Sequence, residues 1–241
     1  MSTYVLVHGA WHDGPTWKAV SDVLTTAGHT VHTPTIAGHG KNVDKNVTHN
    51  ECVQSIVDYF VTNGITDAIL LGHSYGGTII ARVSEEIPDR IRRLIFWNAF
   101  VPAAGHTLLD EVPPHYREMF RALASQSADN TVSLPWEVWR EAFIQDADEE
   151  LAKETYKLLS SEPFEQFTEP LPLDRFYASP IPKSYINGTE DTALPPGEWG
   201  WHPRMSSRLG LFRLVQLPGS HEVMFTNPTL LAQKIIEAGR D

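Results

Sequence analysis

Short apolar segments recur along the chain, and most of them end in a polar or glycine-bearing loop. They lie at residues 4–7, 31–35, 68–71, 93–99, 183–187 and 212–217. The first of them, like the run at 68–71, shows no polar alternation, which is typical of parallel strands that helices cover on both faces. We therefore predict that these segments are the strands of a mostly parallel sheet.

The stretches between these strands carry helical signals. In the stretch 48–62, apolar residues recur every three or four positions. Asn227 is a good helix cap, and Pro228 suits the first turn of a last helix that runs to about residue 238. Further helices are predicted at 15–27 and 78–87. Strands that alternate with helices predict an α/β protein with a doubly wound sheet, which binds ligands at the carboxyl ends of its strands.

The alternation stops between residues 102 and 179. This stretch has helical spacing but no convincing strand, and proline-rich joints flank it. We interpret it as a helical cap, inserted after the strand that ends near Ala99 and lying over the strand ends. Since 241 residues suit a single domain, we predict one domain over 1–241 with the cap 102–179 inside it.

The composition constrains the possible functions more than it constrains the fold. A net charge of −11 without a basic patch disfavours partners such as nucleic acid and anionic membranes. No apolar run approaches the ~20 residues of a membrane-spanning helix. The single cysteine, Cys52, allows no internal disulfide, and we see no signal-like segment, so we predict a cytoplasmic protein. The oligomeric state stays open, and the expected partner is a small-molecule substrate.

The strongest candidate for chemistry is the sequence Gly-His-Ser-Tyr-Gly at residues 72–76. It follows an apolar strand directly and leads into a predicted helix. This G-x-S-x-G arrangement holds Ser74 at the top of a sharp strand-to-helix turn, with its hydroxyl exposed. Gly72 and Gly76 leave room there for neighbouring chain. We therefore predict that Ser74 is a nucleophile.

A serine needs a base to take its proton, and the base needs an acid partner. On this architecture nucleophile, acid and histidine follow one another along the chain, each in a loop after a strand. Of the 11 histidines, His221 fits best, because it follows the last strand. The acid is Glu190 or Asp191 after the preceding strand, and we choose Asp191; Asn98, after an earlier strand, carries no charge.

The oxyanion of a tetrahedral intermediate needs N–H donors. One is the backbone N–H of Tyr75, at the start of the helix after the nucleophile. The other is expected from Ala10 in the His-Gly-Ala-Trp loop at residues 8–11, where Gly9 permits an unusual backbone.

Together these motifs resemble the α/β-hydrolase superfamily, and within it the small methyl esterases and hydroxynitrile lyases. The resemblance covers the whole chain except the cap. It implies the α/β-hydrolase fold, the catalytic triad of Ser74, Asp191 and His221, and no cofactor. Lyases of this group carry a threonine in the oxyanion loop and a lysine after the catalytic histidine. This chain has Gly9 and Glu222 there, which disfavours cyanide release.

The substrate pocket is expected to be aromatic. Trp136, Trp139 and Phe143 share one face of a predicted cap helix, Trp11 lies in the oxyanion loop, and Trp199 and Trp201 follow the acid closely. Packing of the cap onto the core is an equally good explanation for each ring taken singly. The histidines at positions 29, 32, 39 and 49 lack a metal-ligand spacing, so we assign no metal.

The sequence thus predicts a serine hydrolase that cleaves a small apolar or aromatic carboxylic ester or carbamate. Three alternatives remain open: a ligand-binding receptor on the same fold without turnover, a cofactor-free oxygenase that uses the histidine and acid, and a hydroxynitrile lyase. The fold cannot separate them, because it hosts many chemistries.

Overall fold

A six-stranded sheet forms the centre of the computed structural model, which describes residues 1–240. Its strands lie in the order β2-β1-β3-β4-β7-β8, and every pairing among them is parallel. They are β1 (Thr3–Val7), β2 (Thr30–His32), β3 (Ala68–His73), β4 (Ile91–Trp97), β7 (Lys183–Gly188) and β8 (Phe212–Leu217). The predicted α/β class and parallel sheet are confirmed.

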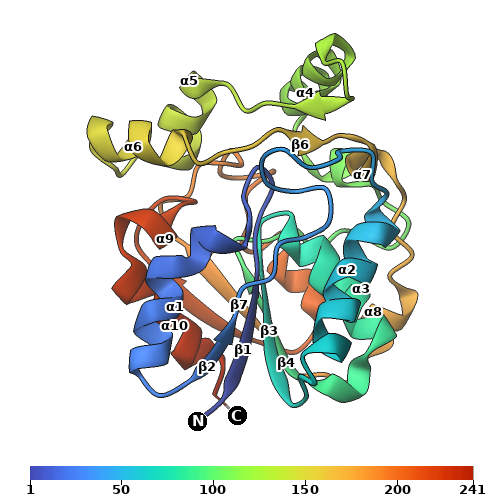
Figure 1. Ribbon diagram of the computed structural model, residues 1–241, viewed down its shortest axis with the longest axis vertical. Coiled ribbons are helices and arrows are strands. Elements are labelled where there is room, and N and C mark those ends of the chain that lie inside the picture. Colours follow the sequence, from blue (N-terminus) through green and yellow to red (C-terminus); the bar gives the residue numbers. More distant parts are fainter. Residues whose placement is uncertain (241) are drawn as a thin grey trace.

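Helices cover both faces of this sheet (Figure 1). On one face lie α1 (Lys18–Thr26) and α10 (Pro228–Ala238), which pack against each other. On the other face lie α2 (His49–Thr62), α3 (Gly76–Glu86) and α8 (Asp174–Ala178). No helix within residues 1–240 has the length and apolar character that a membrane span requires.

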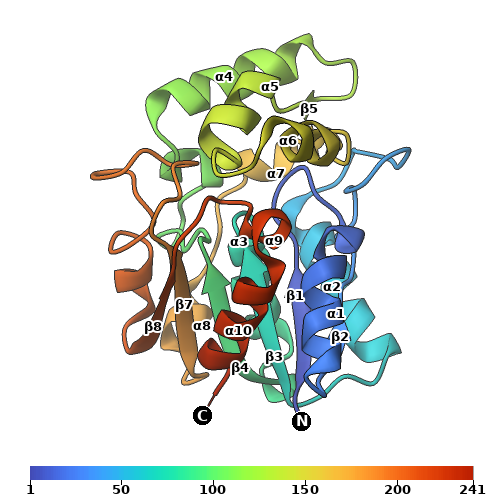
Figure 2. The same ribbon diagram turned by 90° about the vertical axis from the view of Figure 1, so that its left-hand side faces the viewer.

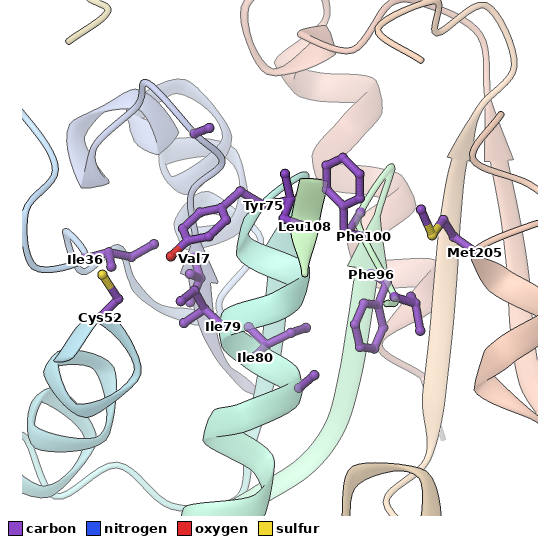
Figure 3. Close-up of a cluster of buried hydrophobic side chains, with 14 of the residues drawn as sticks. Val7, Ile36, Cys52, Tyr75, Ile79, Ile80, Phe96, Phe100, Leu108 and Met205 are labelled. Atoms are coloured by element: carbon purple, nitrogen blue, oxygen red, sulfur yellow. The ribbon is translucent and has the colours of Figure 1, made fainter. Parts of the chain in front are cut away.

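Because successive residues of a strand point to opposite faces, β1 supplies two separate cores. Tyr4 and Leu6 pack with the α1 and α10 side, whereas Val5 and Val7 pack with the α2 and α3 side. Figure 3 shows part of the second core, in which Val7 lies close to Ile79 of α3. The helix caps agree with the sequence: the Asn227 side chain accepts the N–H of Leu230 at 3.1 Å.

The cap segment lies above the carboxyl ends of the strands (Figures 1 and 2). There α4 (Pro114–Gln126), α5 (Trp136–Val138) and α6 (Glu149–Tyr156) cross the top of the molecule. The segment also contains η3 (Leu108–Glu111), the π-helical turn η4 (Trp139–Phe143) and α7 (Glu165–Thr168).

Two details of the cap differ from expectation. Two short strands, β5 (Thr131–Val132) and β6 (Glu162–Pro163), pair antiparallel in a segment for which we predicted none. Two residues per strand are too few to leave an alternating pattern in the sequence. In addition, α8 packs beside α3 and not over the strand ends, and the N–H of Phe176 donates to Glu85 at 2.7 Å.

The turn from β3 into α3 brings backbone very close to backbone. A side chain on Gly72 would place its Cβ 2.5 Å from the carbonyl oxygen of Gly76. A Cβ on Gly76 would lie 2.7 Å from the carbonyl oxygen of His8 in the β1 loop. Glycine is therefore required at both positions for the strand, the helix and the neighbouring loop to approach this closely.

Gly72→Ala should lower the free energy of unfolding by about 1–3 kcal/mol, because its Cβ collides with backbone that cannot rotate away. Gly200→Ala is the matched control, since the nearest atom to its Cβ would be 3.5 Å away. Urea denaturation of both variants measures the difference. Equal stability of the two variants would contradict this account of the turn.

Candidate active site

Ser74 occupies the top of the turn between β3 and α3. Its φ of 52° lies in the left-handed region, which is strained for a residue with a side chain. Backbone hydrogen bonds hold this conformation: the carbonyl oxygen of Ser74 accepts the N–H of Gly77 at 3.0 Å and that of Phe100 at 3.1 Å. The side chain of Ser74 lines an internal cavity beneath the cap.

His221 lines the same cavity, although it lies 147 residues further along the chain. It is placed by the loop between β8 and the short helix α9 (Val223–Thr226), and it is 1% exposed. The indole ring of Trp201 stacks on its imidazole, with 5.2 Å between ring centroids and 12° between planes. This stacking restricts rotation of the ring and shields it from water.

Asp191 follows β7 and faces His221. Its Oδ2 lies 2.6 Å from Nδ1 of His221, and its Oδ1 accepts the N–H of Ala193 at 2.8 Å. The neighbouring Glu190 is exposed, so of the two predicted carboxylates only Asp191 contacts the histidine. The structure thus brings Ser74, His221 and Asp191 to one place.

Asn98 is a residue of this site that sequence reasoning passed over. It follows β4, is fully buried, and donates from Nδ2 to Oδ2 of Asp191 at 2.5 Å. Its Oδ1 accepts the N–H of Gly188 at 2.8 Å, which fixes the orientation of the amide. Its position at the end of a strand was the available signal, but we considered Asn98 only as an acid.

The pKa of His221 reflects two opposing effects. Burial disfavours the imidazolium and lowers the pKa, whereas the Asp191 carboxylate, its hydrogen bond and the nearby Glu222 raise it. The net result is a pKa above the ordinary value of 6.5. The carboxylate also fixes the tautomer: the Nδ1 proton points at Asp191, which leaves Nε2 as the basic nitrogen.

Both predicted oxyanion donors belong to residues that line the cavity, Ala10 and Tyr75. Within residues 1–240, neither backbone N–H donates to another group of the protein. The unusual backbone of the loop is at Trp11, with φ of 64°, and not at Gly9 as we expected. Gly9 is needed for space instead, because a Cβ there would lie 3.0 Å from Cβ of Ser74.

The cavity is apolar and largely aromatic. Apart from Ser74 and His221, the residues that line it are Ala10, Trp11, Tyr75, Phe100, Leu108, Val112, Tyr116, Phe120, Phe143, Phe167, Ala193, Leu194 and Trp201. No Asp, Glu, Lys or Arg of the described chain is among them. Since α4 and η3 of the cap supply three of these side chains, the cap shapes the cavity.

Of the four predicted pocket residues, Trp11 and Phe143 line this cavity, whereas Trp136 and Trp139 do not. Both tryptophans pack within the cap instead, at the π-helical turn η4, in which the N–H of Ile144 donates to the carbonyl oxygen of Trp139 at 3.0 Å. Trp139 stacks on Phe143, with 6.3 Å between ring centroids, but it is completely buried and does not line the cavity. Trp136 packs on Tyr156, and Trp139 donates to the carbonyl oxygen of Ala152.

Glu222 occupies the position that holds lysine in the resembled lyases, and its side chain does not line the cavity. It is buried and lies 3.1 Å from Nε2 of His12. His73, next to the nucleophile, also turns away from the cavity: it stacks on Trp97 and lies 3.1 Å from the carbonyl oxygen of His221. We assign no metal or cofactor to these groups.

Comparison with known proteins decides the family. A model of the alpha/beta hydrolase family matches residues 4–234. The chain belongs to this family. Its resemblance to the methyl-esterase and hydroxynitrile-lyase group, stated above from the sequence motifs, is confirmed by relatives such as an alpha-hydroxynitrile lyase of Arabidopsis thaliana, which is 26% identical, covering 99% of this chain and 97% of that protein.

Three further relatives are similar over nearly the whole chain. The carbendazim hydrolyzing esterase of Nocardioides sp. (strain SG-4G) is 29% identical, covering 99% of this chain and 100% of that protein. An extracellular alpha/beta-hydrolase from a Paenibacillus species, which shares homology with tobacco salicylic acid binding protein 2, is 41% identical over 100% of both chains, with a TM-score of 0.98. A pyrethroid hydrolase from Sphingobium faniae JZ-2 is 28% identical, covering 98% and 96% of the chains, with a TM-score of 0.80.

The contact between His221 and Asp191 predicts how the histidine titrates. Asp191→Asn should lower the pKa of His221, because it removes a negative charge that stabilises the imidazolium and leaves the opposing effect of burial. The imidazole would then take up its proton at a lower pH than in the wild type. NMR titration of the ring proton measures the shift, with the exposed Glu190→Gln as the control. An unchanged pKa in Asp191→Asn would contradict the assignment.

Proposed function

We propose that this protein is a serine hydrolase that cleaves a small apolar or aromatic carboxylic ester or carbamate. The observation that carries the proposal is the pairing of His221 with Asp191 at 2.6 Å, at the wall of an apolar cavity that Ser74 also lines. A buried imidazole held by a carboxylate is the arrangement that removes a proton from a serine hydroxyl. The named activities of the relatives support ester hydrolysis.

The reaction would begin when neutral His221 takes the proton of Ser74 through Nε2, and the serine oxygen attacks the substrate carbonyl. The N–H groups of Ala10 and Tyr75 would then bind the oxyanion, each contributing on the order of 3–4 kcal/mol to the chemical step. His221 next protonates the leaving group. Water, activated by the same imidazole, releases the acyl or carbamoyl group from Ser74.

The lining of the cavity favours a neutral substrate with an apolar body. Aromatic rings from the core and the cap line it, and none of the charged side chains of residues 1–240 does. A charged substrate would lose its hydration there without gaining an ionic partner, which is costly. An aromatic group in the acyl or leaving portion can instead pack against rings such as Phe120 and Phe143.

The other candidate functions fit less well. A receptor without turnover, an idea consistent with the likeness to a tobacco salicylic acid binding protein, needs no buried His221–Asp191 pair beside a strained serine. A cofactor-free oxygenase could use that pair without Ser74. The lyase reaction needs a cation for the departing cyanide. The position that holds lysine in the lyases is occupied here by the acidic Glu222, whose carboxylate faces His12.

Ser74→Ala should lower kcat for p-nitrophenyl acetate by on the order of 10³–10⁶, because no other group can form the acyl-enzyme. The fold should persist, since alanine needs no more space than serine; circular dichroism checks this. Retained turnover in the folded variant would reject the nucleophile and favour the oxygenase. Absent turnover in the wild type, across a set of esters and carbamates, would favour the receptor.

Phe143→Ala should change the ratio of kcat/KM between aromatic and short aliphatic esters, because it removes a ring from the cavity wall. The expected change corresponds to about 1–3 kcal/mol of differential transition-state binding. Trp136→Ala is the matched control, since Trp136 packs within the cap and does not line the cavity. That variant should lose stability but keep the ratio. An unchanged ratio in Phe143→Ala would mean that substrates bind elsewhere.

A further inference from the structure

Trp11 joins the oxyanion loop to the cap through hydrogen bonds to three residues. Its N–H donates to Oε2 of Glu162 at 2.8 Å, and its carbonyl oxygen accepts the N–H of Ser160 at 2.9 Å. Its indole N–H donates to the carbonyl oxygen of Val132 at 2.9 Å. All three partners belong to the β5–β6 region of the cap, so the cap holds Trp11 in its left-handed conformation.

Glu162 is the one acidic residue among these three partners, and its side chain is completely buried. Besides the N–H of Trp11, it accepts from Nε2 of Gln166 at 2.6 Å and lies 2.9 Å from Nε2 of His39. The other ring nitrogen of His39 faces the carbonyl oxygen of Ala37 at 2.9 Å. Both ring nitrogens of His39 thus lie within hydrogen-bond distance of oxygen atoms.

The same network reaches the second oxyanion donor. Oε1 of Gln166 accepts the hydroxyl of Tyr75 and lies 3.0 Å from Sγ of Cys52. Figure 3 shows the Tyr75 side chain extending from the start of α3 toward Ile36 and Cys52. The ring of His39 stacks on that of Tyr75, with 5.7 Å between centroids. Glu162 therefore connects the residue after Ala10 with Tyr75 itself.

We propose that Glu162 is a positioning residue, which sets the oxyanion hole by fixing the Ala10–Trp11 peptide on one side and Tyr75 on the other. This rests on the proposed serine hydrolase function. A buried carboxylate is costly to desolvate, and replacing a whole buried charged network by well-packed apolar residues is often neutral or stabilising. A carboxylate is suited to the site because it can hold several converging donors at once.

Displacing the oxyanion donors should affect the transition state and not the bound substrate. The oxyanion forms only as the tetrahedral intermediate develops, so a misplaced N–H raises the barrier without weakening substrate binding. Losing one such donor lowers kcat by about 10²–10³ in other enzymes. Since Glu162→Gln would displace the Ala10 and Tyr75 donors without removing them, we expect kcat to fall about 10–100-fold with KM nearly unchanged.

Two inhibitors separate this effect from a general loss of structure. Trifluoroacetophenone can form a hemiketal with Ser74 and so needs the oxyanion hole, whereas acetophenone fills the cavity without forming one. In Glu162→Gln, inhibition by trifluoroacetophenone should weaken about tenfold or more, while inhibition by acetophenone stays within about twofold. Titration with a fluorophosphonate counts the folded, reactive enzyme in each preparation.

Glu85→Gln is the matched control. Glu85 is also buried, accepts a backbone N–H from Phe176 at 2.7 Å and pairs with Arg82, but it lies at the end of α3 and does not line the cavity. Its variant should lose stability and keep the ratio of the two inhibition constants. If Glu162→Gln does not fold, Gln166→Met carries the test, because it keeps the carboxylate and cuts the link to Tyr75.

The outcomes are distinct. A wild type that hydrolyses esters, together with a ratio of inhibition constants unchanged in Glu162→Gln, would overturn the role of Glu162 only. Where Gln166→Met takes its place, an unchanged ratio would overturn the link from Glu162 to Tyr75, and with it the proposal that Glu162 sets both oxyanion donors. An equal change of the ratio in Glu85→Gln would also overturn it, by showing that the effect is a general one. A wild type that neither hydrolyses esters nor binds trifluoroacetophenone more tightly than acetophenone would reject the proposed function itself.

Discussion

The contact between β3, α3 and the β1 loop, with no side chains between them, sets the geometry of the whole site. Gly72 and Gly76 allow backbone to approach backbone, and the chain can then turn from strand to helix only through a left-handed Ser74. The same approach brings the oxyanion loop to within contact of Ser74, through Gly9. The same close backbone packing at the end of the parallel sheet thus positions both the nucleophile and the oxyanion donors.

Charge in this region is confined to buried, hydrogen-bonded groups around an apolar cavity. Asp191 is held by Asn98 and a backbone N–H, and its carboxylate raises the pKa of His221 against the effect of burial. On the cap side Glu162 has donors of its own. Because water is scarce there, each of these interactions is stronger than it would be at the surface. The cap therefore contributes both the walls of the cavity and part of its polar framework.

Much of this was readable from the sequence, since it depends on local patterns and on chain order. The apolar runs predicted the strands, and the order of Ser74, Asp191 and His221 singled out three residues that the fold brings together. The pocket was only half predicted, because Trp136 and Trp139 pack against α6 within the cap, a contact that helical spacing alone does not reveal. Glu162 carried no signal at all: an acidic residue in a polar stretch is usually solvated, and its burial depends on contacts more than 100 residues apart.

The most direct test of the account is covalent labelling by a fluorophosphonate, followed by mass spectrometry of the peptides. A fluorophosphonate reacts with a serine whose proton a neighbouring base removes, so labelling reports the assembled site without knowledge of the substrate. We predict a single label per chain, on Ser74, and a rate that falls sharply in His221→Ala. Labelling of another residue, or a rate on Ser74 that does not depend on His221, would contradict the central claim.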